Sequence, residues 1–283
     1  MSATSPKPIV KCRADSRVIV HADDFGETVE ITLGICAAIE GGAVTSTTIM
    51  ASMPGTVDAL NRVTALSTRA SFGVHLNLCE GRPLTRGGTL VNERGEFHRK
   101  RELFWRAMSG RLAAADVEAE VTAQIGRIRD AGVRLSHVDG HKHLHQLPVV
   151  AGVVARVLPR FGIERVRLTR LRRPGVLRQP AALVRELLAV SAAAKFRNAR
   201  LRFPWRVADL QAVMAMNDTE SVARTLQEWR GPVELFCHPG TAKADVDKPG
   251  SCARYAELQF LLSPRFRELV AQHRLRLVNY WEV

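Results

Sequence analysis

The 283-residue chain lacks the features that mark secreted, membrane-spanning and cysteine-metal proteins. Its five cysteines are scattered, with an odd total and no paired ligand spacing, which argues against a disulfide scaffold and fits a reducing compartment. No apolar run approaches the roughly 20 residues that span a bilayer. Residues 1–15 are polar and broken by Pro6 and Pro8, so we expect a disordered N-terminal extension, no signal peptide and a cytoplasmic protein.

Acidic residues are almost missing from one stretch, residues 165–206. It holds twelve Lys or Arg against Glu186 alone, a net charge of +11 out of +13 for the chain. Pro180 opens a helical pattern with apolar residues inside the same stretch. This composition suits an anionic substrate or peripheral contact with the inner face of an anionic membrane, the alternative being an ordinary solvated surface. Nucleic acid is not an expected partner, because no recognition motif accompanies the charge.

Two adjacent carboxylates follow an expected strand. The sequence His-Ala-Asp-Asp-Phe-Gly at 21–26 comes directly after the apolar run 18–20. At a strand end the chain turns, and Asp23 and Asp24 can then face one pocket. Two carboxylates that close repel each other, so a metal ion or a shared proton must compensate. A helical pattern follows, and a helix cap would explain one Asp, but not both.

Three further apolar segments end in histidine, at His75, His141 and His238. In the second of them, His137 and Asp139 alternate onto the face of His141. In parallel α/β folds, functional residues collect at the carboxyl ends of the strands, where the following loops converge. The four strand ends therefore predict a single site.

Strand and helix patterns alternate along the chain. Helical spacing indicates helices at 29–40, 54–65, 116–128, 149–161 and from 180, and strands are expected between them, including 44–50 and 165–169. Such alternation favours right-handed βαβ units around a parallel sheet or barrel. We predict an α/β protein with a single (β/α) barrel domain over residues 16–283, because the candidate residues are spread too widely for an open sheet with one switch point.

The ordered set of motifs resembles a known family. It comprises HADDFG at 21–26, VTSTTIM at 44–50, GVHLNLCEGRPL at 73–84, SHVDGHKHLHQLP at 136–148, HPG at 238–240, and a tail in which Arg254 and Glu257-Leu258 precede Ser263-Pro264. Together they resemble the YdjC-like carbohydrate deacetylases, which include chitooligosaccharide deacetylases and hopanoid-biosynthesis-associated deacetylases. The resemblance implies a distorted (β/α) barrel with one divalent metal ion, Mg²⁺ or Zn²⁺, bound by Asp24, His75 and His141, and with Asp23 as catalytic base.

The residue types agree with that chemistry. One carboxylate and two imidazoles leave open positions on a divalent ion for water and a substrate carbonyl. Asp23 would take the proton of the attacking water, and His238 is the candidate proton donor to the departing amine, with substrate positioning as its alternative. His137 and Asp139 are expected to orient the ligands from behind or to contact substrate. Cys237 should point away from the His238 side.

Three functions follow from these expectations. The leading one is metal-dependent removal of the acetyl group from an N-acetylated amino sugar, on an oligosaccharide or on a lipid-linked or phosphorylated glycan. Another single-metal hydrolase that cleaves an ester or phosphoester is the second. A non-catalytic glycan-binding protein is the third, although binding alone would not require an unligated Asp23 beside the metal.

Overall fold

The computed structural model describes residues 16–170, 180–204, 206–216, 219–226, 231–242 and 252–283. The N-terminal extension expected at 1–15 lies outside these ranges, as does 171–179 of the basic segment, by which we mean residues 165–206. The strands are β1 (Ser16–Phe25), β2 (Ser46–Ile49), β3 (Ser71–Leu76), β4 (Leu135–Gly140), β5 (Arg206–Asp209), β6 (Val233–Cys237) and β7 (Leu275–Leu277). The α-helices are α1 (Val29–Glu40), α2 (Thr56–Leu66), α3 (Lys100–Met108), α4 (Ala114–Asp130), α5 (Pro148–Val157), α6 (Pro180–Asn198), α7 (Leu210–Met214), α8 (Thr219–Leu226), α9 (Cys252–Leu262) and α10 (Pro264–Gln272).

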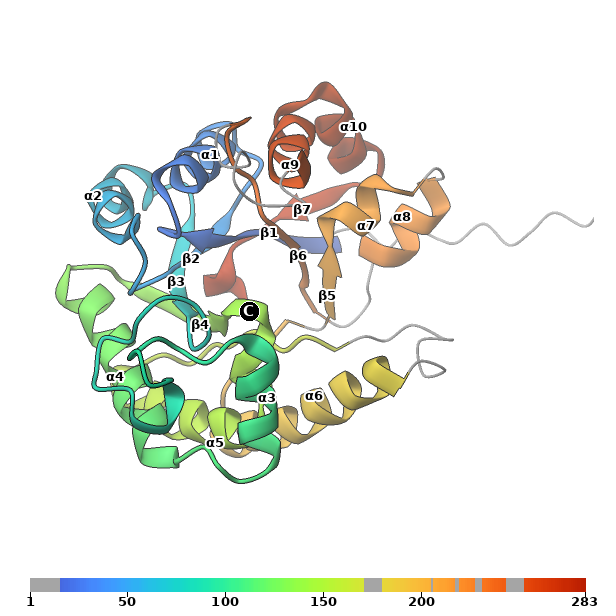
Figure 1. Ribbon diagram of the computed structural model, residues 1–283. Coiled ribbons are helices and arrows are strands. Elements are labelled where there is room, and N and C mark those ends of the chain that lie inside the picture. The colour runs from blue at the N-terminus through green and yellow to red at the C-terminus, as the bar shows by residue number, and fades with distance from the viewer. Residues whose placement is uncertain (1–15, 171–179, 205, 217–218, 227–230, 243–251) are drawn as a thin grey trace, which may run out of the picture.

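The strands form one parallel sheet that curls into a distorted (β/α) barrel. Their order is β4-β3-β2-β1-β6-β5, and β7 pairs with the start of β1. Beyond β4, isolated parallel bridges join Val138 to Val166 and Arg165 to Arg202, which lies shortly before β5, so the pairing continues around the ring. Helices surround the strands in Figure 1. The predicted fold class is confirmed.

In two places the structure differs from the elements expected from the sequence pattern. Residues 165–169 were predicted as a strand but form only isolated bridges, because the chain beside them at Arg202 is irregular and continues the ladder for a single residue. The helix expected at 149–161 is α5 followed by the 3₁₀ turn Leu158–Phe161. Pro159 has no N–H for an α-helical hydrogen bond, which explains the change of helix type there.

The apolar core lies between the strands and the helices, while the inside of the barrel is largely polar. Along β1, Val18, Val20 and Ala22 belong to the core, whereas Ile19 belongs to a small separate cluster with Tyr280. The strand period of two therefore turns Ile19, His21 and Asp23 inward, until the pairing becomes irregular between Ala22 and Phe25. This alternation positions the site.

In the part of the chain that is described, no helix is both long and apolar enough to cross a membrane.

Candidate metal centre and its surroundings

Asp23 and Asp24 face the same site because the chain leaves its extended form between them. Asp24 has a positive φ of 71°, a conformation that non-glycine residues adopt rarely and Asp more readily than most. Neither carboxylate caps the following helix: Thr28 Oγ1 accepts the hydrogen bond from the Ile31 N–H at the start of α1. The cap explanation is therefore excluded, and neither carboxylate is used by the helix that follows.

The structure brings Asp24, His75 and His141 together from β1, β3 and the end of β4. Asp24 Oδ1 lies 3.2 Å from His75 Nε2 and 3.0 Å from His141 Nδ1, and these two nitrogens are 3.3 Å apart. All three side chains are buried. The ligand atoms lie within 4.8 Å of one another and could hold a metal ion. One carboxylate oxygen and two imidazole nitrogens form a donor set that suits a divalent transition metal such as zinc.

Each imidazole of this set meets a second carboxylate through its other nitrogen. His75 Nδ1 is 2.7 Å from Asp139 Oδ1, and His141 Nε2 is 3.4 Å from Glu80 Oε1. An N–H directed to a carboxylate fixes the tautomer and leaves the opposite nitrogen with a lone pair for a metal. Asp139 thus lies where an orienting residue was expected, and Glu80 is a partner that the strand pattern missed.

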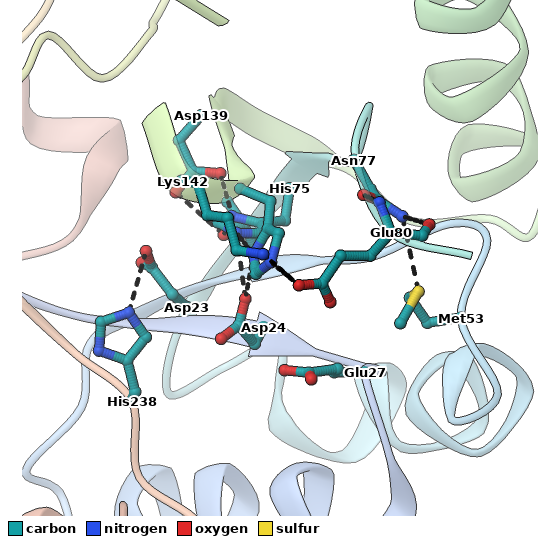
Figure 2. Close-up of polar contacts among 12 residues, drawn as sticks. Asp23, Asp24, Glu27, Met53, His75, Asn77, Glu80, Asp139, Lys142 and His238 are labelled. Atoms are coloured by element: carbon teal, nitrogen blue, oxygen red, sulfur yellow. Dashed lines mark hydrogen bonds and ion pairs between the residues drawn. The ribbon is translucent and has the colours of Figure 1, made fainter. Parts of the chain in front are cut away.

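Arg254 and Lys142 form ion pairs with carboxylates around the two histidines. Arg254, from α9, donates to Asp24 Oδ2 at 2.7 Å and to Glu27 at 3.0 Å, so only Oδ1 of Asp24 is directed at the histidines. Lys142 pairs with Glu80, and Figure 2 shows Glu80 reaching toward it beside Asp24. Glu80 and Arg254 belong to the GVHLNLCEGRPL and tail motifs, but the motifs alone did not indicate which residues these two side chains contact.

The histidines carry protons more readily than ordinary imidazoles. Burial by itself lowers the pKa of His75, but Asp139 and Asp24 outweigh it and hold that pKa well above its usual value. Burial likewise lowers the pKa of His141, and Asp24 raises it above the usual value. A divalent cation bound at this position would take the place of those protons, so its binding should depend on pH.

Asp23 makes a bidentate ion pair with Arg167, a fully buried residue between β4 and β5. Nη1 donates to Oδ2 at 2.8 Å and Nη2 to Oδ1 at 2.7 Å. The same guanidinium also contacts Asp139 at 2.9 Å and Glu234 at 2.5 Å. Burial raises the pKa of Asp23, but Arg167 outweighs that effect and the pKa falls to about 2. Asp23 is therefore ionised at physiological pH.

His137 is fully buried and lies four residues before His141, toward the inside of the barrel from Asp24, His75 and His141. Its ring stacks on Tyr280 with 3.4 Å between centroids, and it contacts the edge of His21. His21, His137 and Asp139 also bring potential ligand atoms close together. Asp139 is already engaged there by Arg167 and by His75 Nδ1.

His238 stands next to Asp23, with 3.8 Å between Nε2 and Asp23 Oδ2, as Figure 2 shows. Its backbone N–H donates to Glu257 of α9 at 2.5 Å. A Cβ on Gly34 of α1 would lie 2.5 Å from the Gly240 backbone, so the His-Pro-Gly turn requires glycine at 34 to pack this closely. Cys237 is buried in the apolar core, as its place in the strand predicts.

A cavity of about 500 Å³ adjoins the site. His143 and Phe236 lie in its wall, and the Phe236 ring contacts both His143 and His238. Five cationic residues and one acidic residue also line it: Lys100, Lys142, Arg170, Arg185, Arg206 and Asp209. Lys142 and Arg170 are paired with Glu80 and Glu186, and basic side chains still outnumber acidic ones in the cavity wall.

Comparison with known proteins gives a consistent result. The family described as YdjC-like protein matches residues 17–272. A carbohydrate deacetylase of Vibrio campbellii is 30% identical over 270 residues, which cover 93% of this chain and 95% of that protein. A carbohydrate deacetylase of Geobacillus stearothermophilus is 38% identical over 156 residues, 55% of this chain and 61% of that protein.

A crystal structure from Enterococcus faecalis shares the fold, with a TM-score of 0.76 and 22% identity over 95% of this chain and 98% of that one. The family match spans nearly all of β1 to α10, including every strand end that contributes to the site. The chain therefore belongs to the YdjC-like protein family.

Proposed function

We propose that this protein is a metal-dependent hydrolase that removes the acetyl group from an N-acetylated amino sugar. The observation that carries the proposal is the cluster of Asp24, His75 and His141 with an ionised, unligated Asp23 directly beside it. Relatives named carbohydrate deacetylases, which align with most of the chain, support the same reaction. The two imidazole donors favour zinc over magnesium, because magnesium prefers oxygen ligands.

The chain's own residues have separate tasks in this reaction. When bound by Asp24, His75 and His141, a divalent ion would acidify a water molecule and polarise the acetamide carbonyl. Asp23 accepts the proton of the attacking water at its carboxylate, while Arg167 holds that carboxylate in place and keeps it ionised. The low pKa of Asp23 makes it a weak base, so it acts on an acidified water and passes the proton on.

His238 is the proposed donor of that proton to the departing amine. It directly follows β6 and lies next to Asp23, and Glu257 of α9 accepts a hydrogen bond from its backbone N–H. The 3.8 Å between the two side chains is longer than a direct hydrogen bond, which leaves a water molecule or the amine itself to pass the proton between them. Asp139 and Glu80 serve a different purpose, since each orients one imidazole.

The other two functions have less support. Phosphoester hydrolysis usually benefits from two metal ions. Within the described ranges both further groups of potential ligands contain Asp139, which already forms an ion pair with Arg167. A protein that only bound glycans would not need the buried ion pair of Asp23, whose burial costs desolvation free energy. The cationic lining of the cavity favours a sugar on a phosphorylated or lipid-linked carrier over a free neutral oligosaccharide.

Release of free acetate from a panel of N-acetylglucosamine-containing glycolipids, phosphorylated sugars and oligosaccharides tests the proposal. The measurement uses metal-loaded protein, chelator-treated protein and Asp23→Asn. Metal-dependent acetate release that Asp23→Asn abolishes supports the proposed function. Hydrolysis of esters or phosphoesters without any acetate from N-acetyl groups would overturn it.

A further inference from the structure

Helix α6 is apolar on two opposite sides. Its inner side packs Ala189, Ala192 and Phe196 into the core, each no more than 1% exposed. Its outer side presents Leu187, 60% exposed, and Val190, 47% exposed. A helix that is apolar all round is normally covered on every side. We therefore expect a binding partner to cover the outer side of α6.

The exposed apolar residues of α6 form a stripe. Leu183, Leu187 and Val190 are spaced by four and three residues, so they lie along one face, with Val184 at its margin. Over the described ranges, no other helix exposes more than two large hydrophobic side chains. We call Leu183, Leu187 and Val190 the outer face of α6.

Charge decides which partner fits this face. Arg197 is exposed and lies seven residues after Val190, on the same face of the helix, and Arg200 is exposed just beyond it. A second copy of the chain would bring two strongly basic surfaces together and be repelled. An anionic lipid surface satisfies both features, because its headgroups attract the cations and its acyl boundary accepts the leucines and valine.

The same helix also borders the cavity beside the site. Arg185 and Leu188 of α6 lie in the cavity wall, and Phe236 in that wall contacts His238. We propose that the outer face of α6 docks on an anionic membrane surface, so that a lipid-linked sugar reaches the site through this cavity. Only the statement about the substrate rests on the proposed function; the docking stands without it.

Sedimentation with lipid vesicles tests the docking on the full chain. Phosphatidylcholine vesicles that contain phosphatidylglycerol should bind the wild type, with an affinity that falls as salt rises, and phosphatidylcholine alone should bind weakly. Leu187→Glu should weaken binding about tenfold or more, since it removes a leucine that the membrane would bury and adds a negative charge that anionic lipid repels. Val57→Glu on α2 is the matched control, because Val57 is also 60% exposed and should leave binding unchanged.

Several results would overturn the docking. These are no sedimentation of the wild type with anionic vesicles at low salt, an equal loss in Val57→Glu, or no loss in Leu187→Glu with its thermal unfolding unchanged. A wild-type dimer in solution that Leu187→Glu dissociates would assign the face to a second copy instead. Acetate release is measured separately, so vesicle binding without deacetylation refutes the proposed function and deacetylation without vesicle binding refutes only the docking.

Discussion

Replacing Asp23 by Asn should abolish most turnover while the protein stays folded. Both oxygens of Asp23 accept from Arg167, at 2.7 and 2.8 Å, and Asn would turn one acceptor into a donor that faces a donor. Such a buried mismatch costs about 1–3 kcal/mol of unfolding free energy, within the roughly 5–15 kcal/mol that stabilises a typical domain. Arg167 keeps Asp139 and Glu234, so no bare cation remains.

The pKa of Asp23 gives a second measure of how much its contact with Arg167 contributes to the free energy of unfolding. Its fall from 3.8 to about 2 corresponds to about 2 kcal/mol that the Asp23 charge contributes to folding. Because the folded pKa is depressed, this stability is complete above the unfolded pKa and is lost as the pH falls toward about 2. The stability gap between wild type and Asp23→Asn should therefore narrow over that acidic range in denaturant titrations.

Loss of the base should lower kcat/KM for deacetylation by about 10²–10⁴-fold. The matched control is Glu234→Gln, which removes a carboxylate from the same guanidinium but lies farther inside the barrel. It should lose similar stability and keep its rate within about tenfold of wild type. Equal rate losses in both variants, or an Asp23→Asn enzyme within a few-fold of wild type, would refute Asp23 as the base.

Three further predictions concern the residues around Asp23. His75→Ala and His141→Ala should each lose most bound metal in elemental analysis, since two ligands hold a divalent ion poorly; full occupancy in either variant removes that residue from the ligand set. Glu80→Gln should weaken metal affinity by about 10–100-fold through loss of its charge near His141 Nε2, with rescue expected in Glu80→Asp, and an unchanged metal Kd contradicts the orienting role. His238→Ala should slow amide substrates far more than activated esters whose leaving group needs no proton, whereas equal slowing of both in steady-state kinetics indicates substrate positioning.

Most strand-end residues could be predicted from two simple rules, the alternation of side chains along a strand and the shared edge of parallel strands. Alternation along β1 and β4 fixes which side chains face inward, and parallel strands place their carboxyl ends at one edge. The inward placement of Asp23, His75 and His141 follows from those rules, whereas Asp24 joins them only because its positive φ and the irregular pairing near the end of β1 break the alternation. The ring of pairing beyond β4 could not be foreseen in detail, because single-residue bridges leave no hydrophobic pattern.

The partners of these residues were beyond the reach of the sequence pattern. Arg167 is one of twelve cations in the basic segment, and nothing local distinguishes a fully buried arginine from its solvated neighbours. Glu80 lies in a loop after β3, and Arg254 reaches Asp24 from a helix 230 residues away in the chain. Such contacts depend on tertiary packing, to which local periodicity is blind.

The left-handed turn at Asp24 affects how this protein can evolve. Glycine and asparagine accept a positive φ at least as readily as aspartate, and each differs from aspartate by a single nucleotide change. Either replacement would preserve the irregular backbone near the end of β1 while removing the carboxylate directed at the two histidines. A descendant that keeps this backbone without the proposed metal ligand therefore lies one mutation away, so a member that lacks the proposed metal site can arise in such a lineage by a single substitution.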